Sequence, residues 1–128
     1  MQRYDPEQEP RAVEWLALDE GRRLDLVEIF HRDERISLRQ KARLAHASIH
    51  VVVENQLALK KEPVVRALLR LMKQGLSRHD AVHAIGSVLG ETVHDAMTNE
   101  ETGEALNARY YAAVERLSAE SWNKSGKH

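Results

Sequence analysis

The chain has 128 residues, 42% of them hydrophobic and 30% charged, which fits one globular domain long enough to bury a core without covalent staples. Nineteen basic residues against 20 acidic ones give a formal net charge of -1, so no overall charge favours nucleic acid or an anionic membrane. Because the chain has no cysteine, disulfides and thiolate metal sites are excluded, and histidine, aspartate and glutamate remain as the strong metal ligands.

The first predicted helix covers about residues 10–33 and begins at Pro10, since proline is tolerated in the first turn of a helix. Glu20 projects into the apolar face of this helix, where a carboxylate needs a partner. The partner is either Arg22 or Arg23 of the same helix, or a metal ion or histidine from a neighbouring helix. Apolar residues at helical spacing predict the buried face: Val13, Leu16, Leu24, Val27 and Phe30.

The second predicted helix begins at Ser37, which has the spacing of a capping box with Gln40, and runs to about residue 60. It carries His46, His50 and Glu54 at successive intervals of four residues, which share one side of a helix. Helical projection places His46 and His50 inward and Glu54 at the edge of the buried face. Because His46 and Glu54 lie about 12 Å apart along the axis, they cannot both bind one ion.

Two further helices are predicted, one from Pro63 to Gly75 and one over about residues 78–97. Ser77 precedes the second of these in the manner of an N-cap, and the helix is apolar nearly all round, the pattern of a central helix. Gly86 and Gly90 each cost on the order of 1 kcal/mol against alanine inside a helix. We therefore expect close approach by another helix or by a ligand at these two glycines.

The last predicted helix begins at Asn99 as its N-cap and runs to about Ser121, with Trp122 after its end. Its apolar stripe consists of Leu106, Tyr110, Val114 and Leu117. The sequence therefore predicts an all-α fold, a single-domain bundle of about five helices over residues 1–122. A disordered tail is expected at residues 123–128.

The histidine pattern predicts a polar centre inside this bundle. A helix with histidines at i and i+4 can give a metal two nitrogen ligands, and two such helices packed together can complete a site. The pair His79 and His83 repeats the spacing of His46 and His50. The alternative is a buried network of histidines and carboxylates that hydrogen-bond to one another without a metal. The candidate metal ligands are His46, His50, Glu54, His79, His83 and Glu20.

Nitrogen and oxygen ligands suit a divalent transition metal, and the sequence does not choose among zinc, iron, manganese and nickel. If the site is catalytic, a metal-bound water with Glu54 or Glu20 as base would give hydrolytic or redox chemistry. The chain has no His-Glu-x-x-His motif, no P-loop and no Rossmann glycine pattern, so zinc-protease and nucleotide-binding chemistry find no support in the sequence.

The motifs of residues 44–97 also occur together in known proteins. They are His46-x-x-x-His50-x-x-x-Glu54-Asn55-Gln56, then Pro63, then His79-x-x-x-His83 and Leu89-Gly90-Glu91. In these features the chain resembles a family of small uncharacterised bacterial helical proteins grouped as a domain of unknown function. The resemblance covers under half of the chain and implies a helical fold and a shared polar centre, without a reaction. Residues 15–20 depart from the family's pattern, which leaves Glu20 without its support.

A second interpretation is a non-catalytic interaction domain, either a homodimer or a partner subunit, because the apolar helix at residues 78–97 needs more covering than four other helices supply. The histidine network would then be structural or pH-sensitive. The basic residues near the start of the second predicted helix indicate a solvated face better than a nucleic-acid site. Without an apolar signal region or a run of about 18 apolar residues, we expect no membrane association and a cytoplasmic location.

Overall fold

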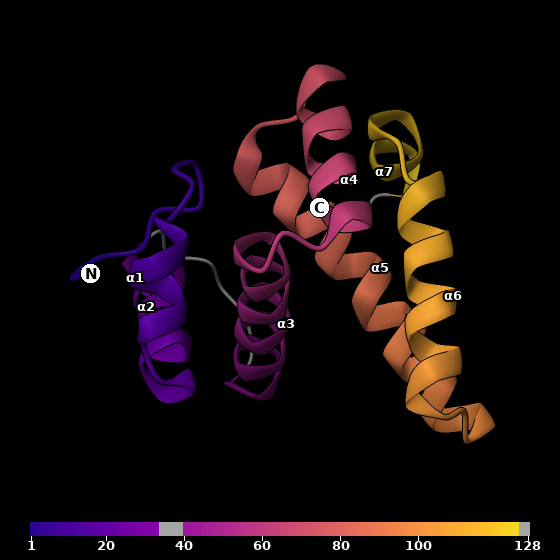
Figure 1. The fold of residues 1–128 in the computed structure, drawn as a ribbon, viewed down its shortest axis with the longest axis horizontal. Helices are drawn as coiled ribbons and strands as arrows, with labels where there is room; N and C mark the ends of the chain where they lie inside the picture. Colours follow the sequence, from indigo (N-terminus) through magenta and orange to yellow (C-terminus); the bar gives the residue numbers. More distant parts are fainter. Residues whose placement is uncertain (34–39, 126–128) are drawn as a thin grey trace.

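The computed structural model describes residues 1–33 and 40–125, and within these ranges the chain forms seven α-helices and no β-strand (Figure 1). The prediction of an all-α fold is confirmed, but the helices described number seven instead of about five. None of them is both long enough and apolar enough to cross a membrane. The helices are α1 (Ala12–Ala17), α2 (Glu20–Asp33), α3 (Gln40–Ala58), α4 (Glu62–Lys73), α5 (Arg78–Asn99), α6 (Gly103–Arg116) and α7 (Ala119–Ser125).

The first predicted helix is divided into α1 and α2 because Asp19 caps a new helix. Leu18 has an extended backbone, with φ -74° and ψ 146°, and ends α1. The Asp19 carboxylate then accepts a hydrogen bond from the backbone amide of Arg22 at 2.8 Å, which satisfies a free N–H at the start of α2. The break changes the direction of the chain, so a helical projection that treats α1 and α2 as one helix assigns the wrong residues to the buried face. Val13, predicted to be buried, is 83% exposed.

The last predicted helix is divided in the same way by a serine. Leu117 is extended, and the Ser118 hydroxyl accepts a hydrogen bond from the amide of Ser121 at 3.0 Å, which starts α7. Trp122, predicted to follow the end of the helix, instead lies within α7 and is buried. Residues 123–125 of the predicted tail belong to this helix as well, and the rest of that tail lies outside the described residues.

The start of α5 follows the prediction and its end does not. The Ser77 hydroxyl accepts a hydrogen bond from the amide of Asp80 at 3.1 Å, which confirms the predicted N-cap. Asn99 is the last residue of α5 instead of a cap, and Glu100 follows it in the left-handed conformation with φ 54°. Thr102 is the residue that precedes α6. The cap predicted at Ser37 lies outside the described residues.

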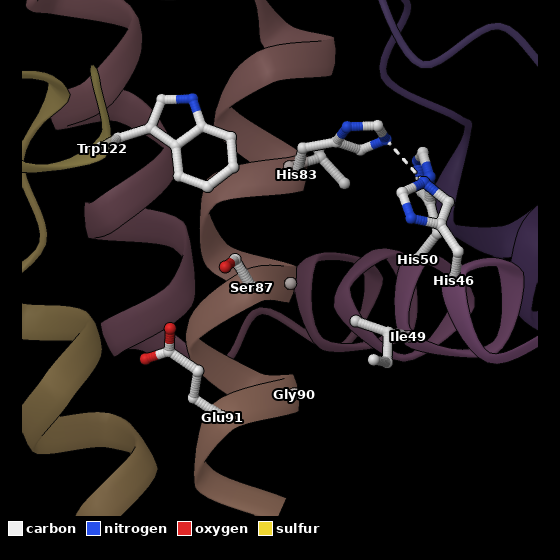
Figure 2. A pocket seen from close by; sticks show the side chains of 10 residues that line it. His46, Ile49, His50, His83, Ser87, Gly90, Glu91 and Trp122 are labelled. Atoms are coloured by element: carbon white, nitrogen blue, oxygen red, sulfur yellow. Dashed lines mark hydrogen bonds between the residues drawn. The ribbon is translucent and has the colours of Figure 1, made fainter. Parts of the chain in front are cut away.

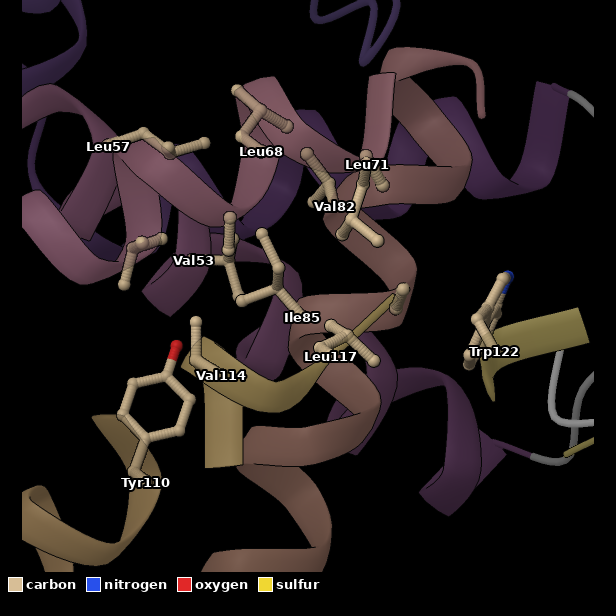
Figure 3. Packing of buried hydrophobic residues seen from close by; sticks show 14 residues of the cluster. Val53, Leu57, Leu68, Leu71, Val82, Ile85, Tyr110, Val114, Leu117 and Trp122 are labelled. Carbon is tan, nitrogen blue, oxygen red and sulfur yellow. The ribbon is translucent and has the colours of Figure 1, made fainter. Parts of the chain in front are cut away.

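Helix α3 stands between two apolar clusters (Figure 1). Helices α1 and α2 lie on one side of it, and α4, α5, α6 and α7 lie on the other. The smaller cluster joins the N-terminal segment, α1 and α2 to the first half of α3 through Tyr4, Trp15, Leu26, Val27, Ala47 and Val51. The larger cluster fills the space between α3, α4, α5, α6 and α7, and Figure 3 shows Val53, Ile85, Tyr110, Val114 and Leu117 within it.

The crossing of α3 and α5 depends on the two glycines singled out in the sequence. A Cβ atom added to Gly86 would lie 3.0 Å from Cγ2 of Ile49, and one added to Gly90 would lie 3.2 Å from Cδ1 of the same residue. The expected close approach by another helix is therefore confirmed. Because Gly86 lies one turn after His83, this contact holds the histidines of α3 opposite those of α5.

We predict that Gly86→Ala lowers the free energy of unfolding by about 1–3 kcal/mol, because Ile49 is β-branched and its Cγ2 cannot move away without leaving its rotamer. Gly103→Ala is the matched control, since nothing lies within 4 Å of a Cβ at that position. Urea denaturation monitored by circular dichroism measures both variants. In a protein that already carries Ile49→Ala, which removes Cγ2, Gly86→Ala should lower the free energy of unfolding by less than it does in the wild-type protein. Equal stability of the Gly86→Ala and Gly103→Ala proteins would contradict the prediction.

Candidate metal centre

Five histidine side chains meet where α2, α3 and α5 come together. Helix α2 contributes His31, α3 contributes His46 and His50, and α5 contributes His79 and His83. Figure 2 shows the rings of His46, His50 and His83 pointing toward one another across the gap between α3 and α5. Among the described residues, one group can place a ligand nitrogen from each member within 4.8 Å of all the others: His31, His46, His50 and His83.

Two histidines of this group have ring nitrogens at the spacing expected of metal ligands. Nε2 of His83 lies 3.0 Å from Nε2 of His46. It also lies 3.1 Å from Nε2 of His79, which is outside the group of four. Two nitrogens that are each about 2.1 Å from one zinc ion lie about 3.0–3.4 Å apart at ordinary coordination angles. Hydrogen bonding accounts less well for this arrangement, because a neutral Nε2 carries either one proton or one lone pair and can make only one good bond.

Within residues 1–33 and 40–125, three buried nitrogen atoms of the centre have no hydrogen-bond partner. They are Nδ1 and Nε2 of His31 and Nδ1 of His50, on side chains that are 1% and 2% exposed. Leaving a buried polar atom unpaired costs about 1–3 kcal/mol, so such atoms are rare in folded proteins. A metal ion at the centre would take one lone pair from each ring and remove most of this cost.

A tyrosine determines which nitrogen of His50 can bind a metal. The Tyr4 hydroxyl donates its proton to Glu54, so its oxygen accepts a hydrogen bond from Nε2 of His50, 2.6 Å away. With the proton on Nε2, the lone pair of His50 lies on Nδ1 and is available to a metal. Burial, and then the charge of Glu54, raise the pKa of Tyr4 well above its ordinary value, which keeps the hydroxyl protonated.

Glu54 acts through this tyrosine because its carboxylate is engaged by Arg78. Each oxygen of Glu54 accepts one guanidinium N–H at 2.8 Å, and the two side chains are 1% and 5% exposed. The sequence predicted that this carboxylate lies at the edge of the buried face. In the structure it is instead fully buried. An oriented carboxylate behind a ligating histidine is a frequent outer partner in metal sites.

The N-terminal segment is tied over the centre at three points. Tyr4 binds His50 and Glu54 as described, the carbonyl of Pro6 accepts a hydrogen bond from Arg78 at 2.8 Å, and the Glu7 carboxylate accepts one from the backbone amide of His79 at 2.8 Å. The last bond also supplies an acceptor and a negative charge to the first turn of α5. These bonds hold the N-terminal segment against α3 and the start of α5.

Burial keeps the imidazoles neutral. Desolvation, followed by the neighbouring histidines, lowers the pKa of His31 to about 4 and that of His83 to about 3. The same causes lower the pKa of His46, and they lower that of His50 well below its ordinary value. At neutral pH these four rings are therefore neutral, and each has one nitrogen lone pair that can bind a metal ion.

The structure brings four of the six candidate ligands together and places two elsewhere. His46, His50 and His83 belong to the group of four, and His79 lies beside it at hydrogen-bonding distance from His83. Glu54 lies behind the histidines. The side chain of Glu20 is 71% exposed and contacts Arg23 at 3.4 Å, so its predicted inward projection is wrong and the partner is the arginine of the same helix. The break before α2 accounts for this error.

Sequence reasoning missed His31 and Tyr4. His31 follows Val27 by four residues and Leu24 by seven, so helical projection along α2 would have placed it on the apolar face. It has no second histidine one turn away, which is why the spacing of pairs did not reveal it. Tyr4 lies 46 residues from His50 in a segment without helical periodicity, and no local pattern indicates that contact.

A cavity of about 240 Å³ opens beside the centre (Figure 2). His46, His50 and His83 form one end of it, and Ile49 and Trp122 are among its apolar walls. His46 and His83 are only half-buried, so their rings reach this space. The centre is thus accessible from the cavity side.

Neither a protein-family model, nor a curated protein, nor a solved structure matches this chain. The resemblance to the bacterial helical family therefore stays a prediction.

We predict that Arg78→Met lowers the free energy of unfolding by about 3–5 kcal/mol, because it leaves the Glu54 carboxylate buried without its counter-charge. Arg66→Met is the matched control: Arg66 pairs with Glu115 at 2.5 Å, but both side chains are largely exposed, and no measurable change in stability is expected. Urea denaturation at pH 7 compares the two. A loss for Arg78→Met no larger than that of the control would contradict the role assigned to the buried pair.

Proposed function

We propose that the protein binds one divalent transition metal ion through His31, His46, His50 and His83. The observation that carries this proposal is the convergence of four imidazoles from three helices, with buried nitrogens of His31 and His50 that no described residue partners. A purely structural network would need one hydrogen-bond donor and one acceptor for each buried imidazole, and the described residues supply neither to His31.

The chemistry of the ligands narrows the choice of metal. The four ligands are all imidazoles, and Glu54 is kept out of the ligand set by its bonds to Arg78 and Tyr4. Imidazole suits zinc, copper, iron and nickel, whereas manganese and magnesium favour carboxylate and water ligands. Of the metals that the sequence leaves open, zinc, iron and nickel therefore fit better than manganese.

Metal binding would link parts of the chain that are far apart in sequence. The ligands come from α2, α3 and α5, and the N-terminal segment closes over them through Tyr4. A metal that binds only the folded chain raises its stability by RT ln(1 + [metal]/Kd), or about 2.7 kcal/mol at a hundredfold excess over Kd. Binding is therefore measurable both as metal content and as a rise in melting temperature.

We expect protein purified without an affinity tag to contain, or to take up after chelation, one zinc, iron, copper or nickel ion per chain, measured by mass spectrometry of the metals. His83→Ala should abolish stoichiometric uptake and the accompanying rise in melting temperature, because it removes a ligand shared by the closest nitrogen contacts. His94→Ala is the matched control, since His94 is exposed on the same helix. Folded wild-type protein that neither contains nor takes up these metals would overturn the proposal.

We further expect Tyr4→Phe to weaken metal affinity by about 10–100-fold while the stoichiometry stays at one ion per chain, because the hydroxyl sets the tautomer of His50. A competition titration against a chelator of known affinity measures the change. Tyr111→Phe is the control, since Tyr111 lies on α6 away from the histidines. Unchanged affinity in folded Tyr4→Phe protein would exclude the orienting role of the hydroxyl.

A further inference from the structure

We infer that the cavity beside the histidines binds a small carboxylate ligand, whose carboxylate ligates the metal and whose apolar body lies against the cavity walls. This inference rests on the proposed metal site and adds a ligand class to it. Three features carry it: the charge left on the metal, the side from which the metal can be reached, and the lining of the cavity.

The charge at the centre favours an anion. All four imidazoles are neutral ligands, so they leave the two positive charges of the metal uncompensated. The buried carboxylate behind them does not supply the missing charge, because Glu54 is already paired with Arg78. An anion that enters the centre therefore gains electrostatic energy in a setting of low dielectric, where charge interactions are strong.

The cavity is the accessible approach to the metal. Tyr4 is 1% exposed and covers His50 on the opposite side, where the N-terminal segment is hydrogen-bonded to the start of α5. On the cavity side His46, His50 and His83 themselves form the end of the space (Figure 2). A ligand in the cavity can thus reach the metal without displacing a helix.

The size and walls of the cavity indicate a small ligand with an apolar body. Its volume of about 240 Å³ falls below the range of about 300–1,000 Å³ that is typical of drug-sized ligands. Ile49, Val82 and Trp122 supply apolar surface to its lining. The indole of Trp122 offers a flat wall to an aromatic or aliphatic body.

The test uses the full chain loaded with cobalt(II), whose visible absorption reports a change of ligands. Benzoate and its neutral isostere benzamide are titrated into it. Benzoate should change the spectrum with saturation, and it should bind at least about tenfold more tightly than benzamide.

A substitution that fills the cavity tests the location. Ser87→Phe places a ring in the space, and it should weaken benzoate binding by at least about tenfold. Thr98→Phe, at an exposed position on the same helix, should have no effect. Benzoate that binds no better than benzamide overturns the inference, as does benzoate that binds equally well to folded Ser87→Phe protein. Absence of cobalt uptake would remove the metal site itself, whereas uptake without a benzoate response would remove only the ligand inference.

Discussion

The buried ion pair between Glu54 and Arg78 is the interaction on which the arrangement of the centre depends. Both charges are removed from water, and two hydrogen bonds of 2.8 Å between them offset the cost of desolvation. Arg78 also bonds the carbonyl of Pro6, and Glu54 accepts the proton of Tyr4. One pair therefore joins α3 to the start of α5, fastens the N-terminal segment over both and, through Tyr4, fixes the tautomer of His50.

The position of α3 explains why a polar centre can exist in so small a domain. The helix has one apolar cluster on each side, and the histidines lie where the two meet. Neither cluster is continuous there, so imidazoles occupy the junction without opening a gap in either. The glycine contact with Ile49 brings α5 close enough for its histidines to reach those of α3. Apolar packing thus determines the separation of the helices, and the ion pair determines which polar atoms face each other.

Features that depend on local spacing could be predicted from the sequence, and features that depend on pairing across the chain could not. The inward direction of His50, the cap at Ser77 and the close approach at Gly86 follow from helical periodicity or the chemistry of one residue. The contact of Tyr4 with His50 requires the N-terminal segment to return over α3, which no periodicity encodes. Glu20 was placed wrongly because Asp19 caps a new helix within an otherwise helical pattern. Positions projected from residues before this break therefore do not hold for residues after it.

The ion pair also determines the charge that the centre presents. Were Glu54 free, its carboxylate could ligate the metal directly and leave a single positive charge. Because Arg78 and Tyr4 bind both of its oxygens, the carboxylate acts one residue away, where it orients His50 and would leave the charge of the proposed metal uncompensated. The interaction that stabilises the junction of α3 and α5 would thereby keep a metal at the centre electrophilic toward the cavity. A substitution at Glu54 therefore alters its structural and its chemical role together, whereas Tyr4→Phe removes only the hydroxyl that orients His50 and keeps the ring in the apolar cluster.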